Sequence, residues 1–255
     1  MTKRLEILAV ERFPLVDPGA SLSQLILDTL HNEQLSLQNR DVLVLAQKIV
    51  SKSEGCYVDL RNVTPTARAQ RLAGKCDKDP RLVQVILNES VDVLRCVPGV
   101  IVVRHRLGLV MANAGIDHSN IEHGVDSQRV LLLPANPDES ARGLRTELEM
   151  ATGLNLAVLI NDSFGRPWRL GTTGVCIGCS GIVTLLDQRG NTDLFGQELL
   201  VTQVAVGDEV ATAASLLMGQ ADEARPVVIV RGLEFPRSPD SAQHLMRPPD
   251  QDLFL

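Results

Sequence analysis

The chain has 255 residues, of which 44% are hydrophobic, enough for one large or two small soluble domains with a buried core. Its net charge of −6 argues against a broad nucleic-acid surface, which needs clustered positive charge. No apolar run reaches the about 20 residues of a membrane span, and the N-terminal run is too short for a secretion signal. We therefore expect a cytoplasmic protein that binds neither nucleic acid nor a membrane.

Hydrophobic patterns in the first third of the chain predict two strands and three helices. Residues 5–10 form a short strand, and residues 41–46 form a continuous apolar strand that is buried on both faces. Apolar residues at helical spacing predict a helix from Ser21 to about Gln34. Two more helices are expected to start at Thr64-Pro65 and Asp79-Pro80, where a capping side chain precedes a proline.

The remainder of the chain adds further strands and two long helices. Strands are expected at residues 100–104, 107–112, 130–133, 156–160 and 227–230. One helix begins at Asn136-Pro137 and ends at Gly153, and the other is capped by Asp208 and ends at Gly219. Strands and helices do not alternate strictly, so we expect an α+β fold of mixed sheets with packed helices. A domain at residues 1–235 would precede an extended, proline-rich tail at 236–255.

Two acidic motifs follow predicted strands. Asp117 lies in NAGIDHSN after the strand at 107–112, and Asp162-Ser163 follows the strand at 156–160. Mg²⁺ and Mn²⁺ bind carboxylate and other oxygen ligands, so both motifs are candidate metal ligands. The same residues also form Asx turns, and spacing alone favours that simpler interpretation.

Basic residues near the same strands could hold phosphate groups. Lys48 and Lys52 lie just after the strand at 41–46, and Arg166 and Arg169 flank a Pro-Trp pair. Lysine binds phosphate as a point charge, and arginine binds carboxylate or phosphate in a bidentate way. A solvated lysine or a structural arginine in a tight turn would look the same. The sequence thus offers candidate metal ligands and candidate phosphate-binding cations, and it has no recognisable motif for a catalytic nucleophile. This combination indicates phosphoryl transfer.

The cysteines and histidines supply no further chemistry. Cys176 and Cys179 form a C-x-x-C without the second ligand pair that structural zinc needs, so we expect small buried thiols. His105, His118 and His123 do not have a zinc-ligand spacing.

Several long motifs resemble those of the coenzyme F420-0:L-glutamate ligase family, also called F420 gamma-glutamyl ligases. They span about residues 10–235 and comprise RFPLVDPG, DVLVLAQKIVSKSEG, NAGIDHSN, LINDSFGRPWRLG, VCIGCSGI, DLFGQEL, GDEVATAASLLMGQAD and VVIVRGL. The resemblance implies that GTP activates a carboxylate of F420-0 as an acyl phosphate, which the amino group of L-glutamate attacks. Further glutamates are then added through gamma linkages.

The resemblance also implies cofactors and an assembly. Two divalent ions, Mg²⁺ or Mn²⁺, would support the reaction, and a monovalent cation such as K⁺ is an additional cofactor. The fold would be that of the family, an unusual α+β one that forms an intertwined homodimer. Because the chain ends at Leu255, we expect a stand-alone ligase without the nitroreductase-like domain that follows in some bacteria.

The motifs assign roles to individual residues by resemblance. Asp117 and Asp162 would be carboxylate metal ligands, Ser163 would assist a second ion, and Arg166 and Arg169 would face anionic groups. The residues expected to contact GTP are Arg12, Phe13, Pro14, Leu15, Gln47, Lys48, Lys52, Asn120, Met218, Gly219, Gln220, Ala221, Asp222, Glu223 and Ala224. Trp168 would either pack at the rim of the site or stack on a ring.

One position departs from the family pattern. Archaeal members carry a glutamate after Met-Gly as a ligand of the second ion, and this chain has Gln220 there, followed by Asp222 and Glu223. Gln220 can still bind the ion through its carbonyl oxygen but neutralises no charge, so Asp222 or Glu223 could replace it. This departure is the one support for an alternative to the ligase, a nucleotide- or deazaflavin-binding protein without turnover. A ligase for another carboxylate acceptor and a metal phosphohydrolase are two further alternatives.

Overall fold

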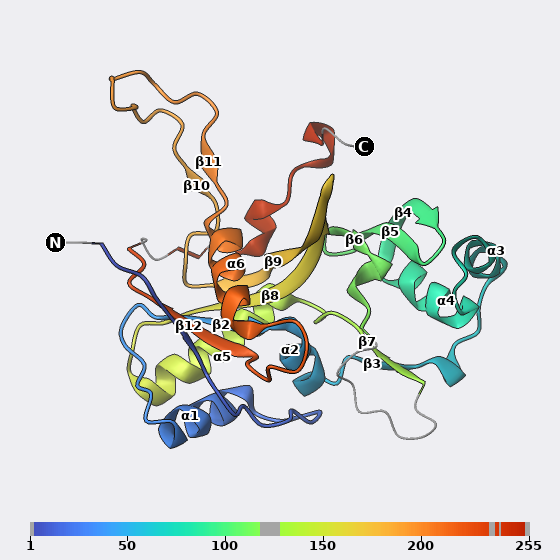
Figure 1. Cartoon of the computed structure of the whole chain (residues 1–255), viewed down its shortest axis with the longest axis horizontal. Coiled ribbons are helices and arrows are strands. Elements are labelled where there is room, and N and C mark those ends of the chain that lie inside the picture. Colours follow the sequence, from blue (N-terminus) through green and yellow to red (C-terminus); the bar gives the residue numbers. More distant parts are fainter. Residues whose placement is uncertain (1–2, 118–127, 235–237, 240, 253–255) are drawn as a thin grey trace.

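The computed structural model describes residues 3–117, 128–234, 238–239 and 241–252. Its centre is a five-stranded sheet with the strand order β1-β12-β2-β8-β9 (Figure 1). The strands are β1 (Glu6–Ala9), β12 (Val227–Arg231), β2 (Val42–Ala46), β8 (Ala157–Arg166) and β9 (Arg169–Ser180). Only β2 and β8 are parallel to each other, and the other neighbours are antiparallel. The mixed sheet confirms the α+β expectation.

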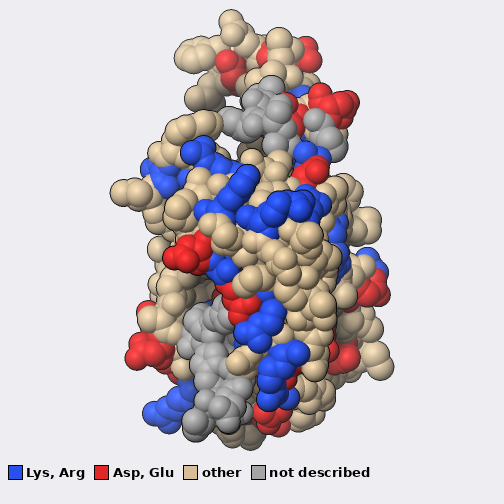
Figure 2. Space-filling model, turned by 90° about the vertical axis from the view of Figure 1, so that its right-hand side faces the viewer, with Lys and Arg blue, Asp and Glu red and all other residues tan. Residues whose placement is uncertain are grey.

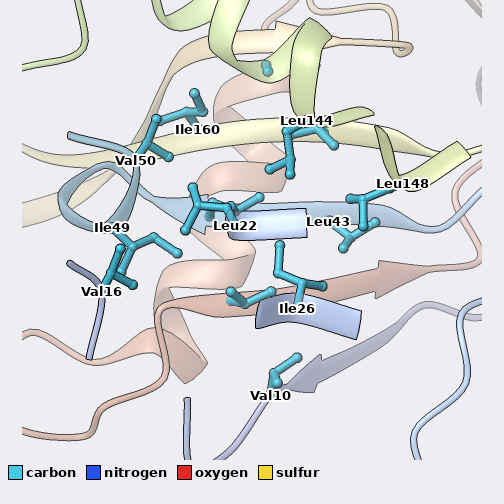
Figure 3. Close-up of a cluster of buried hydrophobic side chains, with 14 of the residues drawn as sticks. Val10, Val16, Leu22, Ile26, Leu43, Ile49, Val50, Leu144, Leu148 and Ile160 are labelled. Carbon is cyan, nitrogen blue, oxygen red and sulfur yellow. The ribbon is translucent and has the colours of Figure 1, made fainter. Parts of the chain in front are cut away.

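Helices cover both faces of this sheet. Helices α1 (Leu22–Asn32) and α5 (Pro137–Thr152) pack on one face, where Ile26 and Leu148 contact the apolar cluster around Leu43 (Figure 3). Helix α6 (Val206–Met218) packs on the other face in a second cluster. Successive residues of β2 therefore face different cores, as the continuous apolar run predicted.

Side-chain caps set the ends of several helices. Ser21 accepts a hydrogen bond from the backbone of Gln24 at the start of α1, and Asn136 accepts one from Glu139 at the start of α5. Gly153 ends α5 with a φ of 70°. The predicted cap of α6 was wrong, because Ala205 is its N-cap and Asp208 lies in the first turn. Asp208 instead accepts a bond from the backbone N–H of Cys176 in β9, at 2.9 Å.

The connection from β2 to β8 builds a separate lobe beside the sheet. It comprises α2 (Gln47–Ser53), β3 (Tyr57–Asp59), η1 (Leu60–Asn62), α3 (Ala67–Cys76), α4 (Pro80–Asn88), β4 (Ser90–Val97), β5 (Val100–His105), β6 (Val110–Ala112), η2 (Asn113–Gly115) and β7 (Arg129–Leu131). Strands β4, β5 and β6 form a three-stranded sheet, which shares an apolar core with α3 and α4. Strand β3 pairs with β7.

The lobe contains most of the differences from the sequence prediction. Helix α2 and strand β4 were not predicted, and β6 is shorter than the predicted strand at 107–112. Helix α3 starts two residues later than expected, because Thr66 and not Thr64 is its N-cap. Asp79 and Pro80 do start α4 as predicted.

An arm and the C-terminal segment complete the chain. Strands β10 (Leu186–Asp187) and β11 (Gln203–Val204) pair at the base of a loop that projects from the body (Figure 1). After β12, the short 3-10 helices η3 (Ala242–Leu245) and η4 (Pro249–Gln251) follow, and Ala242 is buried against the core under α6. No helix among the residues described is long and apolar enough to cross a membrane.

Close approach of helices explains the glycines of β9. A Cβ atom on Gly178 would lie 2.5 Å from the carbonyl group of Pro137, and one on Gly174 would lie 2.5 Å from the carbonyl oxygen of Ala211. These glycines therefore let the start of α5 and the middle of α6 lie directly on the strand. Cys176 and Cys179 lie between and beside them as free, buried thiols, as predicted.

Replacing Gly178 by alanine should destabilise the protein. The new methyl group meets backbone atoms of Pro137 that cannot rotate away, so we expect the free energy of unfolding to fall by about 1–3 kcal/mol. The melting temperature should fall by about 2–4 °C for each kcal/mol. Gly143→Ala is the control, because nothing lies within 4 Å of a Cβ there and the residue is in α5. Equal melting of the two variants would contradict the packing role of Gly178.

Candidate active site

The candidate site lies where β2 ends beside β8. Strand β2 stops at Ala46, opposite Asn161, whereas β8 continues to Arg166. Among the residues described, β9 is the one strand that pairs with β8 beyond Asn161, so the other edge of β8 is unpaired there, on the side where α2 begins. Ligands of open α/β sheets bind at the carboxyl ends of such parallel strands.

This arrangement corrects the predicted position of Asp162-Ser163. We expected these residues in a turn after a strand that ends at residue 160, but they lie within β8, which pairs with β9 up to Arg166. Serine, glycine and aspartate are weak strand formers, so propensity missed the continuation. Backbone hydrogen bonds to β9 hold these residues in the strand although their intrinsic strand propensity is low.

Three charged side chains from separate elements meet at this edge. Lys48, the second residue of α2, places its Nζ 3.4 Å from Oδ1 of Asp117, and both side chains are partly buried. Asp117 is held by two backbone hydrogen bonds of 3.0 Å to Leu131 of β7. Asp162 lies close enough to both for the charges of Asp117 and Lys48 to shift its pKa. The structure thus brings together the two predicted metal ligands and one predicted phosphate-binding lysine.

The electrostatics of Asp162 follow from this setting. The pKa of Asp162 is raised from 3.8 to about 7, chiefly by burial and further by the charge of Asp117, although a hydrogen bond from the Ser163 N–H and the charge of Lys48 act in the opposite direction. Two carboxylates therefore share one lysine in partly desolvated surroundings. A hard divalent cation would relieve this repulsion, so the donor set fits Mg²⁺ or Mn²⁺.

The number of carboxylates also suits such an ion. Among the residues described, no group of three or more His, Cys, Asp or Glu side chains gathers at one point. Mg²⁺ in particular binds through one or two carboxylates together with water and substrate phosphates, so two are sufficient. The lysines on α2 then fit the phosphates: Lys52 lies one turn after Lys48 on the same face of the helix.

Strand alternation places Ser163 on the other face of β8 from Asp162. Asn161, which shares that face with Ser163, donates hydrogen bonds from its buried amide to Ser215 and Met218 of α6. The Oδ1 atom of Asn161 is buried and has no hydrogen-bond partner among the residues that the structure describes. An ion assisted by Ser163 would thus lie toward the end of α6, where Gln220 follows.

The segment after α6 is exposed and partly folded back on itself. Glu223 accepts a 2.8 Å hydrogen bond from the backbone N–H of Ala221, which lowers the pKa of its carboxyl. Its side chain also lies directly against Gly219, whose φ is 72°. Gln220 and Asp222 are exposed. Glu223 is therefore engaged within its own loop, unlike the other two candidates for the second ion.

Short contacts tie the predicted nucleotide segments to the same edge. The backbone N–H of Ala46 donates to the carbonyl of Pro226 at 2.8 Å, so the segment after α6 returns beside the start of α2. Arg225 forms an ion pair of 2.9 Å with Glu11, next to the predicted turn at residues 12–15. Three segments far apart in sequence thus meet at one end of the sheet.

Burial distinguishes the side chains of these segments. Phe13, Gln47 and Met218 are buried, so they support the surface from below, whereas Arg12, Pro14 and Leu15 are exposed. Gln47 donates to the hydroxyl of Ser51 at 2.6 Å and to the Leu132 carbonyl at 3.3 Å. Sequence reasoning missed this inner role, for which the i, i+4 spacing of Gln47 and Ser51 in an unrecognised helix was the signal.

Two predicted arginines lie apart from the carboxylates. Arg166 and Arg169 pair across the tip of the β8–β9 hairpin, where Pro167 and Trp168 form the turn and Trp168 has a φ of 55°. Four residues of strand separate Arg166 from Asp162, a distance of about 13 Å. Trp168 is 83% exposed at this tip. The last predicted residue, Asn120, lies outside the described residues.

Comparisons with known proteins show which family the sequence is similar to. The sequence model of the family F420-0:Gamma-glutamyl ligase matches residues 11–232. Proteins named Coenzyme F420:L-glutamate ligase are similar over almost their whole length. That of Methanocaldococcus jannaschii is 41% identical over 254 residues, covering 99% of this chain and 97% of the relative. That of Methanopyrus kandleri is 44% identical over 257 residues, covering 99% and 98%. That of Methanothermobacter thermautotrophicus is 42% identical over 252 residues, covering 98% of each.

Replacement of Asp162 by asparagine should stabilise the metal-free protein. With a pKa raised from 3.8 to about 7, the native state retains a proton that the unfolded state releases, so stability falls as the pH rises through this window. Asparagine stays neutral. In the presence of a chelator, we expect Asp162→Asn to melt at least 2–4 °C above the wild type at about pH 8. This difference should shrink as the pH falls toward 4.

The matched control is Asp92→Asn, which removes an exposed carboxylate on β4. Its melting should follow the wild type at every pH. If Asp162→Asn instead melted below the wild type at pH 8, the claim that the ionised carboxylate of Asp162 destabilises the metal-free protein would be wrong.

Proposed function

The chain belongs to the F420-0:gamma-glutamyl ligase family, and we propose that it joins L-glutamate to coenzyme F420-0 at the carboxyl ends of β2 and β8. The match over residues 11–232 is the observation that carries the proposal. The relatives' printed name, Coenzyme F420:L-glutamate ligase, supports the substrates. The site is consistent with this name because it brings together two carboxylates and a lysine, groups that suit an ion and phosphate.

The chemistry that we propose has two steps. A carboxylate oxygen of the acceptor attacks the γ-phosphorus of GTP, and GDP leaves. The amino group of L-glutamate then attacks the acyl phosphate, an amide bond forms, phosphate leaves and an amine proton passes to solvent. Positioning and charge neutralisation supply most of the catalysis in phosphoryl transfer, so a covalent intermediate on the protein is not required.

Each group of the site has a part in these steps. Asp117 and Asp162 would hold Mg²⁺ or Mn²⁺, which neutralises phosphate charge and polarises the phosphoryl group. Lys48, 3.4 Å from Asp117, would turn to the phosphates once an ion takes up the charge of the carboxylates. Ser163 and Gln220 would serve a second ion on the α6 side. The exposed Arg166 and Arg169 would meet an anionic part of the acceptor.

Stepwise addition of glutamate should depend on every component. We expect mass spectrometry of F420-0 with the protein, GTP, L-glutamate and Mn²⁺ to detect added glutamyl residues, and none when any component is omitted. Asp117→Asn should abolish this addition, because the ion loses a ligand, while Asp92→Asn at an exposed position of β4 should leave it unchanged.

Other outcomes would select the alternatives. Phosphate release from GTP without an amino acid would indicate a metal phosphohydrolase. Addition to another carboxylate in place of F420-0 would indicate a different acceptor. GTP binding by the folded protein without any addition would contradict the ligase and indicate a silent binder.

We also propose that two copies of the chain associate. The arm between β10 and β11 projects from the body and exposes Leu194 and Phe195 almost completely, together with Val201 (Figure 1). Apolar side chains gathered on a projecting loop are typical of an interaction site. A second copy would cover them, as the family resemblance implies.

The arm provides the test of association. We expect sedimentation of a dimer at micromolar concentration, and a shift to monomer in Leu194→Ser/Phe195→Ser. Both side chains lie in solvent in the single chain, so the substitutions should leave its melting temperature unchanged. A wild-type monomer at that concentration would refute the dimer.

A further inference from the structure

Positive charge is concentrated in one part of the lobe, residues 60–106. Residues 60–106 hold nine Lys and Arg against four Asp and Glu, although the whole chain has a net charge of −6. The rest of the protein is therefore strongly acidic. Such segregation creates a local positive field on a protein that repels anions elsewhere.

A row of cations runs along α3. Arg68, Arg71 and Lys75 are exposed and are spaced by three and four residues, whereas Ala69 and Ala73 face the core on the other side. The helical rise of 1.5 Å per residue separates the three charges by about 4.5 and 6 Å along the axis. The row is thus linear, unlike the compact cluster that a single phosphate needs.

One further residue extends the row. Lys78 follows the helix. Figure 2 views the molecule from this side and shows Lys and Arg side chains gathered across it. We call the four residues Arg68, Arg71, Lys75 and Lys78 the basic face.

The basic face has no acidic partners of its own. Within the described ranges, none of its side chains forms an ion pair or a hydrogen bond, whereas Arg61, Arg81 and Arg106 of the same lobe are each paired with a carboxylate. The charges are therefore available to a ligand from outside the chain. Such a ligand must be anionic.

The lobe's core connects the basic face to the candidate site. Ala114 is buried in the core beneath α3, and Ile116 packs against it. Asn113 accepts a 3.2 Å hydrogen bond from the backbone of Ile101. The segment that carries Asp117 is thus built on the same core as α3, and a ligand that spans both surfaces would be anchored to one body.

The composition of residues 60–106, the part of the lobe that carries the basic face, favours carboxylates over nucleic acid. Residues 60–106 contain no Phe, Tyr or Trp on which bases could stack, and stacking platforms are a main part of single-strand binding. Arginine binds carboxylates with paired hydrogen bonds. A linear row of Arg and Lys therefore fits a flexible chain with regularly spaced carboxylates.

We propose that the basic face binds the oligo-γ-glutamate tail of the growing product, an inference that rests on the proposed function. Each ligation converts one carboxylate to an amide and brings two new ones, so every step adds one negative charge to the tail. A longer tail should therefore bind the basic face more tightly, while its terminal carboxylate lies at the site of Asp117 and Asp162.

Direct binding tests this without turnover. We would measure fluorescence anisotropy of labelled γ-linked di-, tri- and pentaglutamate with the full chain, at about 50 and about 300 mM salt. Affinity should rise with length and fall with salt. The variant Arg68→Gln/Arg71→Gln/Lys75→Gln should bind pentaglutamate about tenfold more weakly, since three exposed ion pairs are lost.

The matched control is Arg4→Gln/Arg142→Gln/Arg189→Gln, which removes the same charge outside the lobe and should bind as the wild type. Equal weakening in both triple variants, or no weakening in the first, would overturn the proposal. An oligonucleotide of equal charge that binds more tightly, and loses its affinity in the first variant, would overturn it in favour of nucleic acid.

The result is separable from that of the proposed function. If the wild type binds pentaglutamate through these residues but ligates nothing, the proposal that the basic face binds the tail is supported and the ligase proposal is wrong. If it ligates, the first triple variant should add the first glutamate to F420-0 at the wild-type rate and later ones more slowly. Equal slowing of every addition would overturn the role of the basic face.

Discussion

The parallel pairing of β2 with β8 is the constraint on which the rest of the structure depends. Two parallel neighbours cannot be joined by a tight turn, so the chain must leave the end of β2 and return to the start of β8. Here that connection contains the whole second lobe as well as α5. The unequal ends of the two strands then leave a polar edge beside α2, where the candidate site lies.

The site combines groups that are unfavourable in a folded chain. Asp117 and Asp162 lie close to each other with Lys48 as their shared cation, and the buried amide oxygen of Asn161 has no hydrogen-bond partner within the described part of the chain. Strained or unsatisfied groups of this kind persist where surrounding structure holds them, and they concentrate at functional sites. In this protein the two apolar cores of the sheet provide that support, because they fix β2 and β8 from both sides.

Sequence reasoning succeeded where local signals were strong. The apolar run of β2 and the Asn-Pro start and Gly end of α5 are set by nearby residues, so their positions could be predicted. Strand β4 and the outer half of β8 exist through pairing with distant strands, which no local pattern reveals. Helix α2 is only seven residues long and directly follows a strand, so its pattern merged with that of β2.

The same distinction applies to the site. Asp117, Asp162 and Lys48 could be named as candidates because acids and lysines near strand ends are visible in the sequence. Their convergence could not be derived, since it depends on how the lobe sits against the sheet. Phe13 and Gln47 lie in motifs of the nucleotide segments, but their burial follows only from packing and hydrogen bonds within the fold.

The origin of the two carboxylates has a mechanical consequence. Asp162 belongs to the central sheet, whereas Asp117 is attached to the lobe through its backbone bonds to β7. A cation that binds both must therefore fix the angle between sheet and lobe, and any rotation of the lobe must change the separation of the ligands. Ion affinity and lobe orientation are therefore linked. The free energy by which the ion favours one orientation equals the free energy by which that orientation favours binding of the ion.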